Sequence, residues 1–258
     1  MEKSVEERLA ESLTATSTEL LQYLPYLLQD FWELGSSPQI MSEILQTNIP
    51  SLEGMQILDL GCGKGAVSVA LARTLSAKVT GIDIIPEFIE YAKSKAQEFK
   101  VSELCTFIAE DINQSIERER NYDCVVFGAV GAVLGAPAEM LPKLKQTVKP
   151  GGYILIDEAY LAANNEGGNV AYQMDYLTRE QWLALFEQLG LELVDEKVNE
   201  GDLEFDEDNA NIKQRADELK KLHPEQSALF DGYVQSQLDE CYDLENNIVG
   251  VVWLLRVK

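Results

Sequence analysis

The stretch Ile57-Leu58-Asp59-Leu60-Gly61-Cys62-Gly63-Lys64-Gly65 decides the fold of this chain. An apolar run carries one acidic residue near its end and is followed by three glycines at alternate positions. This pattern is typical of a buried parallel strand that turns directly into a helix over a bound ligand. Glycine is needed because the turn visits backbone angles closed to other residues, and because a side chain would collide with the ligand. The helix that follows presents unpaired N–H groups and a positive dipole end to that ligand.

These glycines fit two families of cofactor-binding proteins: the family that binds dinucleotides such as NAD, and a second family that is described below. The six residues from Gly61 to Ala66 satisfy the dinucleotide pattern G-x-G-x-x-G/A, and Asp83 supplies the acidic residue that both families place about 20 positions on. Asp59 separates the two families, because it has no natural role in an NAD-dependent dehydrogenase. A third interpretation is that a glycine-rich turn merely joins two elements.

Composition limits the architecture and the location of the protein. The chain has 258 residues, of which 46% are hydrophobic, enough for one sizeable core and too little for two typical domains and a linker. No apolar stretch approaches the roughly 18 residues of a membrane span, so no membrane partner is predicted. The first residues are charged where a signal peptide would become apolar, which predicts a cytoplasmic protein.

The net charge of −23 argues against a nucleic-acid partner, because binding to phosphates depends on Lys and Arg. A neutral or cationic small substrate fits that charge better. No metal site is predicted. The acidic stretch 195–208 lacks the glycine and glutamate of a calcium-binding loop, and the cysteines are scattered and are interpreted as small buried residues. The four cysteines are Cys62, Cys105, Cys124 and Cys241.

Strand and helix patterns alternate from residue 55 onward, which indicates βαβ units and a mostly parallel sheet. The expected strands are 56–60, 78–83, 105–109, 122–128, 153–157, 191–198 and 248–257. The expected helices between them are 65–75, one opening at Pro86, 138–147 and 178–189. The last two strands suggest an edge hairpin, but about fifty residues separate them, far more than a hairpin loop holds.

Two helical regions lie outside this alternation. Residues 1–50 are helical and aromatic and are expected to form an N-terminal cap over the cofactor site. Residues 51–258 then form the cofactor-binding domain, with a helical insertion at about 203–246 that breaks near His223 and Pro224. Five aromatic residues are candidates for a substrate chamber, although aromatic residues at helical spacing are more often core. They are Tyr23, Tyr26, Trp32, Tyr172 and Tyr176.

The glycine stretch closely resembles the first motif of class I S-adenosylmethionine (SAM)-dependent methyltransferases, in which Asp-x-Gly-x-Gly-x-Gly wraps the methionine end of the cofactor. Further landmarks of that family follow in order over roughly residues 40–200 and the last strand. Asp83 ends the second strand where the family binds the ribose hydroxyls, Asp111 stands where it binds the adenine amine, and the Lys149–Gly152 turn precedes the fifth strand. Taken alone, an aspartate at a strand end is more often a helix cap.

The resemblance implies an α/β, Rossmann-like fold. Its sheet would have seven mostly parallel strands with an antiparallel last strand, and helices would cover both faces. The cofactor would be SAM and the product S-adenosylhomocysteine. The cofactor-binding residues that the resemblance implies are Asp59, Gly61, Cys62, Gly63, Gly65, Asp83, Ile84, Asp111, Ile112 and Phe127.

Two features depart from the commonest family patterns. Lys64 stands in the second gap of the glycine stretch, where a small residue is more usual, and the spacing of a phosphate-binding P-loop is absent. The chain after the fourth strand, 129–135, lacks the polar Asn-Pro-Pro-Tyr-like tetrad of enzymes that methylate planar amines. This absence favours a small-molecule acceptor.

We therefore predict a methyltransferase that transfers the sulfonium methyl to a small molecule by in-line displacement. A SAM-binding module without turnover remains an alternative, an NAD-dependent dehydrogenase is a weaker one, and aminopropyl transfer is more remote. No residue is assigned as catalytic, and no pattern defines the oligomeric state. Asp157, Glu158 and Tyr160 are weak candidates at the end of the fifth strand. His223, the one histidine, is a further candidate by its pKa range, although a surface role is favoured for it.

Overall fold

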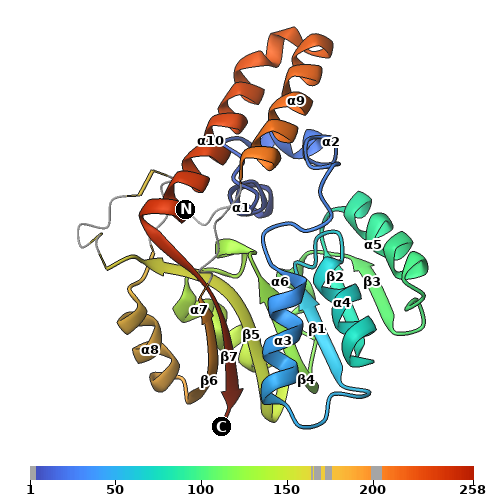
Figure 1. Ribbon diagram of the computed structural model, residues 1–258, viewed down its shortest axis with the longest axis vertical. Helices are drawn as coiled ribbons and strands as arrows, with labels where there is room; N and C mark the ends of the chain where they lie inside the picture. The colour runs from blue at the N-terminus through green and yellow to red at the C-terminus, as the bar shows by residue number, and fades with distance from the viewer. Residues whose placement is uncertain (1–3, 164, 166–169, 172–175, 199–204) are drawn as a thin grey trace.

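The computed structural model describes residues 4–163, 165, 170–171, 176–198 and 205–258 (Figure 1). Within these residues, seven strands form one sheet in the order β3-β2-β1-β4-β5-β7-β6. All neighbouring pairs are parallel except those of β7, which is antiparallel to both β5 and β6. The strands are β1 (Gln56–Leu60), β2 (Lys78–Asp83), β3 (Cys105–Ala109), β4 (Tyr122–Gly128), β5 (Val148–Leu161), β6 (Leu191–Val198) and β7 (Ile248–Val257). The predicted Rossmann-like class, with its antiparallel last strand, is confirmed.

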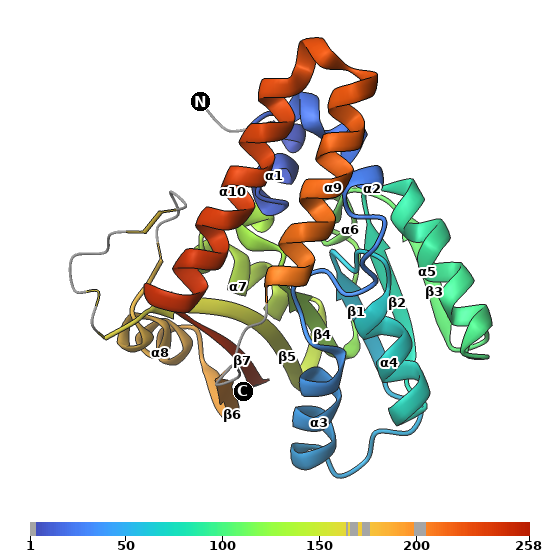
Figure 2. The ribbon, with the colours of Figure 1, turned by 45° about the horizontal axis from the view of Figure 1, so that its top comes forward.

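Helices cover both faces of the sheet (Figures 1 and 2). One face carries α3 (Pro38–Asn48), α4 (Ala66–Leu75) and α5 (Pro86–Glu98). The other carries α6 (Ile112–Ser115), α7 (Pro137–Lys145) and α8 (Arg179–Gln188), together with the short 3₁₀ helix η2 (Gly131–Leu134). Each face therefore has its own apolar core, as expected for a parallel sheet buried on both sides.

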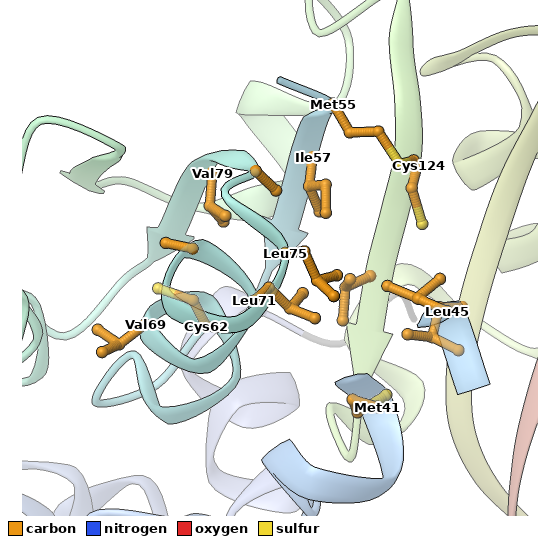
Figure 3. Packing of buried hydrophobic residues seen from close by; sticks show 14 of the residues in the cluster. Met41, Leu45, Met55, Ile57, Cys62, Val69, Leu71, Leu75, Val79 and Cys124 are labelled. Atoms are coloured by element: carbon orange, nitrogen blue, oxygen red, sulfur yellow. The ribbon is translucent and has the colours of Figure 1, made fainter. Parts of the chain in front are cut away.

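The first core lies between the sheet and the helices α3 and α4. Figure 3 shows side chains from both helices meeting those of β1, β2 and β4. The α4 residues that take part, Val69, Leu71 and Leu75, are almost fully buried. This burial fixes α4 against the sheet, where it contacts β2, so the turn between β1 and α4 has little freedom to move.

The third apolar cluster lies outside the sheet and joins both ends of the chain. It brings together α1 (Val5–Ser12), η1 (Thr18–Tyr23) and α2 (Leu24–Leu27) with the hairpin of α9 (Asp206–Leu222) and α10 (Ser227–Asn246). Leu24, Leu27 and Phe230 are fully buried in it. We call these five elements the helical cap. Figures 1 and 2 show it standing over the edge of the sheet at which the parallel strands end.

Two details differ from the expectations. The helix α3 lies in the range assigned to the N-terminal cap, yet it packs on the sheet, because its buried side chains Met41, Ile44 and Leu45 belong to the first core. The strand β5 begins at Val148 rather than at residue 153. The Lys149–Gly152 turn lies within this strand as a bulge. It shifts the register of the pairing with β4 between Tyr122 and Cys124.

No helix in the described part of the chain is long and apolar enough to cross a membrane.

Candidate functional site

A pocket lies at the carboxyl ends of β1, β2 and β4, beneath the helical cap. The strand order reverses between β1 and β4, and open α/β sheets bind their ligands at such a point. Eight of the ten residues expected to bind a cofactor line this pocket. They are Asp59, Gly61, Cys62, Gly63, Asp83, Ile84, Asp111 and Ile112.

The glycine loop is shaped by backbone conformation and by close packing. Gly61 and Gly65 have φ angles of +73° and +74°, in the left-handed region that favours glycine. A Cβ on Gly61 would lie 2.7 Å from a methyl group of Val130, and one on Gly65 would lie 2.7 Å from the Cβ of Ala92. Gly65 does not line the pocket. It is the N-cap of α4 and turns the chain into that helix.

Asp83 fixes the shape of the same loop from the end of β2. Its carboxylate accepts hydrogen bonds from the backbone N–H groups of Gly63, at 2.8 Å, and Ile85, at 3.0 Å. Burial raises the pKa of Asp83, and these backbone bonds partly offset that effect. Each carboxylate oxygen retains a lone pair, so the group can still accept the hydroxyl protons of a ribose diol. The residue therefore fits the role that the sequence implied.

Asp59 is almost completely buried at the end of β1 and accepts a 2.5 Å hydrogen bond from the hydroxyl of Ser68. Burial raises its pKa to about 6, and the nearby charge of Asp83 adds to the effect. Asp111 is the N-cap of α6, where its carboxylate accepts the backbone N–H of Asn113 at 2.9 Å. Asp111 thus combines the capping role with a place in the pocket wall.

The helical cap supplies the opposite wall, which the sequence did not predict in detail. Val5, Leu9 and Ser12 of α1 and the following Leu13 line the pocket, as do Trp32, Leu34 and Ser36 of the segment before α3. The hydroxyl of Ser36 is buried and lies close enough to the Asp157 carboxylate to lower its pKa. Only Trp32 of this set was a candidate from the sequence. The short, irregular segment around it carries no periodic pattern by which the others could have been found.

Phe127 does not reach the pocket. Its side chain is fully buried in the second core, which lies on the other face of the sheet, between the strands and the helices α7 and α8. Side chains alternate along a strand, so its neighbours Val126 and Gly128 line the pocket in its place.

Two carboxyl groups, those of Asp157 and Glu158, lie on β5 at the point where its pairing with β4 ends. Asp157 pairs in register with Gly128, and the buried Ser36 hydroxyl lies against both of them. Burial raises the pKa of Asp157 to about 6. Burial, together with the charge of Asp157, raises the pKa of Glu158 to about 8. Neither residue lines the pocket itself, and Asp157 lies behind the pocket residues Ser36 and Gly128.

Tyr160 and His223 lie away from the pocket. Tyr160 stacks on Trp253 at 6.0 Å between ring centroids. His223 is the C-cap residue of α9, where the chain turns towards α10, and its ring centroid lies 5.4 Å from that of Tyr23. The structure therefore does not bring His223 to the site, because the sequence break near it is the turn of the hairpin.

The aromatic candidates do not form one chamber. Tyr23 and Tyr26 donate hydrogen bonds to Gln226 and Glu218, both at 2.6 Å, within the helical cap. Tyr176 does not line the pocket, and Tyr172 lies outside the described residues.

In the described part of the chain, no group of three or more His, Cys, Asp or Glu side chains is placed to hold a metal ion.

Comparison with known proteins gives consistent results. A family model described as a methyltransferase domain matches residues 51–220. The uncharacterized protein YjhP of Escherichia coli is 36% identical over 150 residues, which are 55% of this chain and 59% of that protein. A ribosomal protein L11 methyltransferase of Photobacterium profundum is 34% identical over 106 residues, which are 41% of this chain and 34% of that enzyme. The chain thus spans less than two thirds of the length of either relative.

A solved structure extends the likeness to almost the whole chain. A SAM-dependent methyltransferase from Geobacter sulfurreducens, crystallised in complex with S-adenosyl-L-homocysteine, superimposes with a TM-score of 0.78. The superposition covers 92% of this chain and 98% of that one, at 21% sequence identity. At this identity the likeness concerns the fold alone.

Proposed function

The chain belongs to the SAM-dependent methyltransferase family, and on that premise we propose that it transfers the sulfonium methyl of SAM to a small-molecule acceptor. The observation that carries the proposal is the gathering of eight motif residues from the strand ends around one pocket. The helical cap covers that pocket, and closure of an active site excludes water from the reacting groups.

The residues of the pocket fit this cofactor. Asp83 would accept the ribose hydroxyls, and Ile84 and Ile112 would pack against the adenine ring. The glycine loop would lie against the methionine end, and Gly61 lets this loop approach Val130 of the pocket wall closely. Bound SAM would supply an activated methyl group. The task of the protein is then to hold the acceptor in line with it.

The site favours a neutral or cationic acceptor. The net charge of the chain is −23, and Asp157 of β5 lies beside Gly128, the last residue of β4. With a pKa of about 6, this carboxyl is ionised at neutral pH. Asp157 would hold a cationic amine or receive a proton from it, and the Ser36 hydroxyl would offer a hydrogen bond. Glu158, with a pKa of about 8, would keep its proton.

A protein acceptor is the second candidate, because one relative is a ribosomal protein L11 methyltransferase. The wall formed by α1 and Trp32 weighs against it, since a protein side chain would have to pass this cover. The two candidates can be separated with radiolabelled SAM and a cell extract. We expect label in the small-molecule fraction, whereas label in the protein fraction would favour the second candidate.

Thermal unfolding with S-adenosylhomocysteine and with NAD⁺ tests the cofactor. Ligand at about a hundred times its dissociation constant adds about 2.7 kcal/mol to stability. For a chain of this size we expect a rise in Tm of roughly 5 to 10 °C. S-adenosylhomocysteine should produce this rise and NAD⁺ should not. A rise with NAD⁺ alone would restore the dehydrogenase interpretation.

The variant Asp83→Asn tests the site, with Asp123→Asn as its control. Asp123 also accepts a backbone N–H, that of Gln56 at 2.8 Å, but at the opposite edge of the sheet. We expect Asp83→Asn to abolish the Tm rise with S-adenosylhomocysteine and Asp123→Asn to preserve it. Equal rises in both variants would show that Asp83 does not bind the cofactor.

A further inference from the structure

Lys64 points away from the pocket floor and into the chain that covers it. Although it lies in the glycine loop, its side chain is almost completely buried, with only 4% of the residue exposed. Its ammonium group donates hydrogen bonds to the carbonyl oxygens of Leu28 and Phe31, the latter at 2.6 Å. Its own backbone carbonyl accepts a hydrogen bond from the indole N–H of Trp32 at 3.1 Å. Lys64 therefore joins the glycine loop to residues 28–34, which we call the covering segment.

The surroundings of the ammonium are aromatic. The Nζ atom lies 5.1 Å from the ring centroid of Tyr91 and 5.5 Å from that of Phe88, both on α5. Burial lowers the pKa of Lys64 to about 8, and the charge of Asp30 opposes this shift. The group is therefore protonated at neutral pH, and both carbonyl bonds are charge-assisted.

The covering segment closes the site from above. A Cβ placed on Gly63 would lie 3.3 Å from a methyl group of Leu34, so Leu34 rests on the glycine loop. At Gly35, a Cβ would lie 2.6 Å from that of Ala129, so the chain also rests on the end of β4. Trp32 and Leu34 line the pocket. A ligand in the pocket would therefore lie against this segment.

We propose that Lys64 is a positioning residue that holds the covering segment closed over bound SAM or S-adenosylhomocysteine and so sets how long the ligand stays bound. This inference rests on the proposed cofactor site. It gives a function to the one residue of the glycine stretch that departs from the usual small side chain. The lysine acts through residues 28–34 and needs no contact with the ligand.

The dissociation rate of S-adenosylhomocysteine tests the inference in Lys64→Met, which keeps the length of the side chain and removes the ammonium. Opening of the covering segment must precede release, so we expect release to be about tenfold faster or more. Lys145→Met is the matched control. The Nζ of Lys145 donates to the carbonyl oxygen of Leu189 at the end of α8, far from the pocket, at 2.5 Å. Release from this control should match that from the wild type.

The variant Trp32→Phe removes the other hydrogen bond between the covering segment and the glycine loop, and it leaves the Lys64 side chain unchanged. It removes the 3.1 Å bond to the Lys64 carbonyl and keeps a ring to stack on Phe99. We expect faster release here too, and in the double variant a gain smaller than the two single effects combined. Unchanged release in Lys64→Met, or fully additive effects, would overturn the inference. A wild-type protein that does not bind S-adenosylhomocysteine would instead reject the cofactor site beneath it.

Discussion

Asp59 places a carboxyl group in the interior of the protein beside the glycine loop. It accepts a hydrogen bond from the Ser68 hydroxyl at 2.5 Å, and the neighbouring carboxyl of Asp83 opposes its ionisation. Burial of a charge beside another of the same sign lowers the stability of the folded state. Asp59 therefore lowers the free energy of unfolding, while it contributes a carboxyl group to the wall of the pocket.

Asp59→Asn should stabilise the protein in a pH-dependent way. The pKa of Asp59 rises from 3.8 in the unfolded chain to about 6 in the fold. Wild-type stability therefore falls as pH rises from about 4 through 6, because the folded state resists ionisation, and it stays low above that range. We expect the variant to be more stable by about 1–3 kcal/mol above pH 6, with the gain vanishing towards pH 4. Urea unfolding at pH 4, 6 and 8 measures this, and a gain independent of pH would contradict it.

For single residues, the sequence predicted which of them come together in the pocket, but not the hydrogen bonds that each one makes. Asp83 and Asp111 were predicted from their places after strands, and both line the pocket. The capping bond of Asp111 was an open alternative, and both interpretations apply to the same residue. The partners of Lys64 could not be predicted, because they are backbone carbonyls more than thirty residues away.

The helices α1 and α8 begin with the same N-terminal capping motif. Ser4 and Glu7 form a capping box at α1, and Thr178 and Gln181 form one at α8. The surroundings of the two helices differ. Helix α8 packs on the second core, whereas α1 forms part of the pocket wall.

Removal of the N-cap side chain should therefore have different effects at the two helices. Thr178→Ala should lower the free energy of unfolding by about 1 kcal/mol and leave the affinity for S-adenosylhomocysteine unchanged. Ser4→Ala should fray α1, change global stability little and weaken that affinity. Chemical unfolding and calorimetric titration of both variants give the comparison. An equal loss of affinity in both would show that α1 contributes nothing specific to the site.

Elements with a strong local pattern were predicted well. The first four strands and both late strands begin and end at the residues expected from the sequence. The strand β5 is longer than predicted, because pairing with β7 continues to Leu161 and depends on a partner almost ninety residues away. The place of α3 on the sheet likewise depends on tertiary contacts and not on its helical pattern.

Over the whole molecule, one ion pair links the covering segment to the inserted hairpin. The guanidinium of Arg215 on α9 donates two hydrogen bonds to Asp30, at 2.6 and 2.8 Å, and one to Glu218 at 2.9 Å. Arg215 holds the pKa of the Asp30 carboxyl below its ordinary value. The segment that Lys64 holds from below is thus held from above by the inserted helices.

Arg215→Met should loosen this link. We expect weaker binding of S-adenosylhomocysteine, with a smaller difference from the wild type at high salt, because the pair is partly exposed. Arg179→Met is the control, since Arg179 makes a similar two-bond pair with Glu196 away from the pocket. Titrations at two salt concentrations measure the effect. Equal affinities in both variants would mean that the hairpin does not support the site.

The sequence predicted an N-terminal cap and an inserted cap as separate features. In the structure they share one apolar core, in which Leu24 and Leu27 meet Ile212 and Phe230. Helical spacing identified the buried face of each helix but not its partner, because segments almost two hundred residues apart can pair in many ways.

The position of β7 between β5 and β6 sets an order of assembly during synthesis. The strand β6 pairs with no other strand than β7 among the described residues, and β7 ends at Val257. While the ribosome is still adding residues 248–257, β6 has no strand to pair with, and the edge of β5 that pairs with β7 has no partner. A nascent chain of this protein therefore exposes part of its core until residue 257 has emerged, and this is the stage at which chaperones would have most to protect.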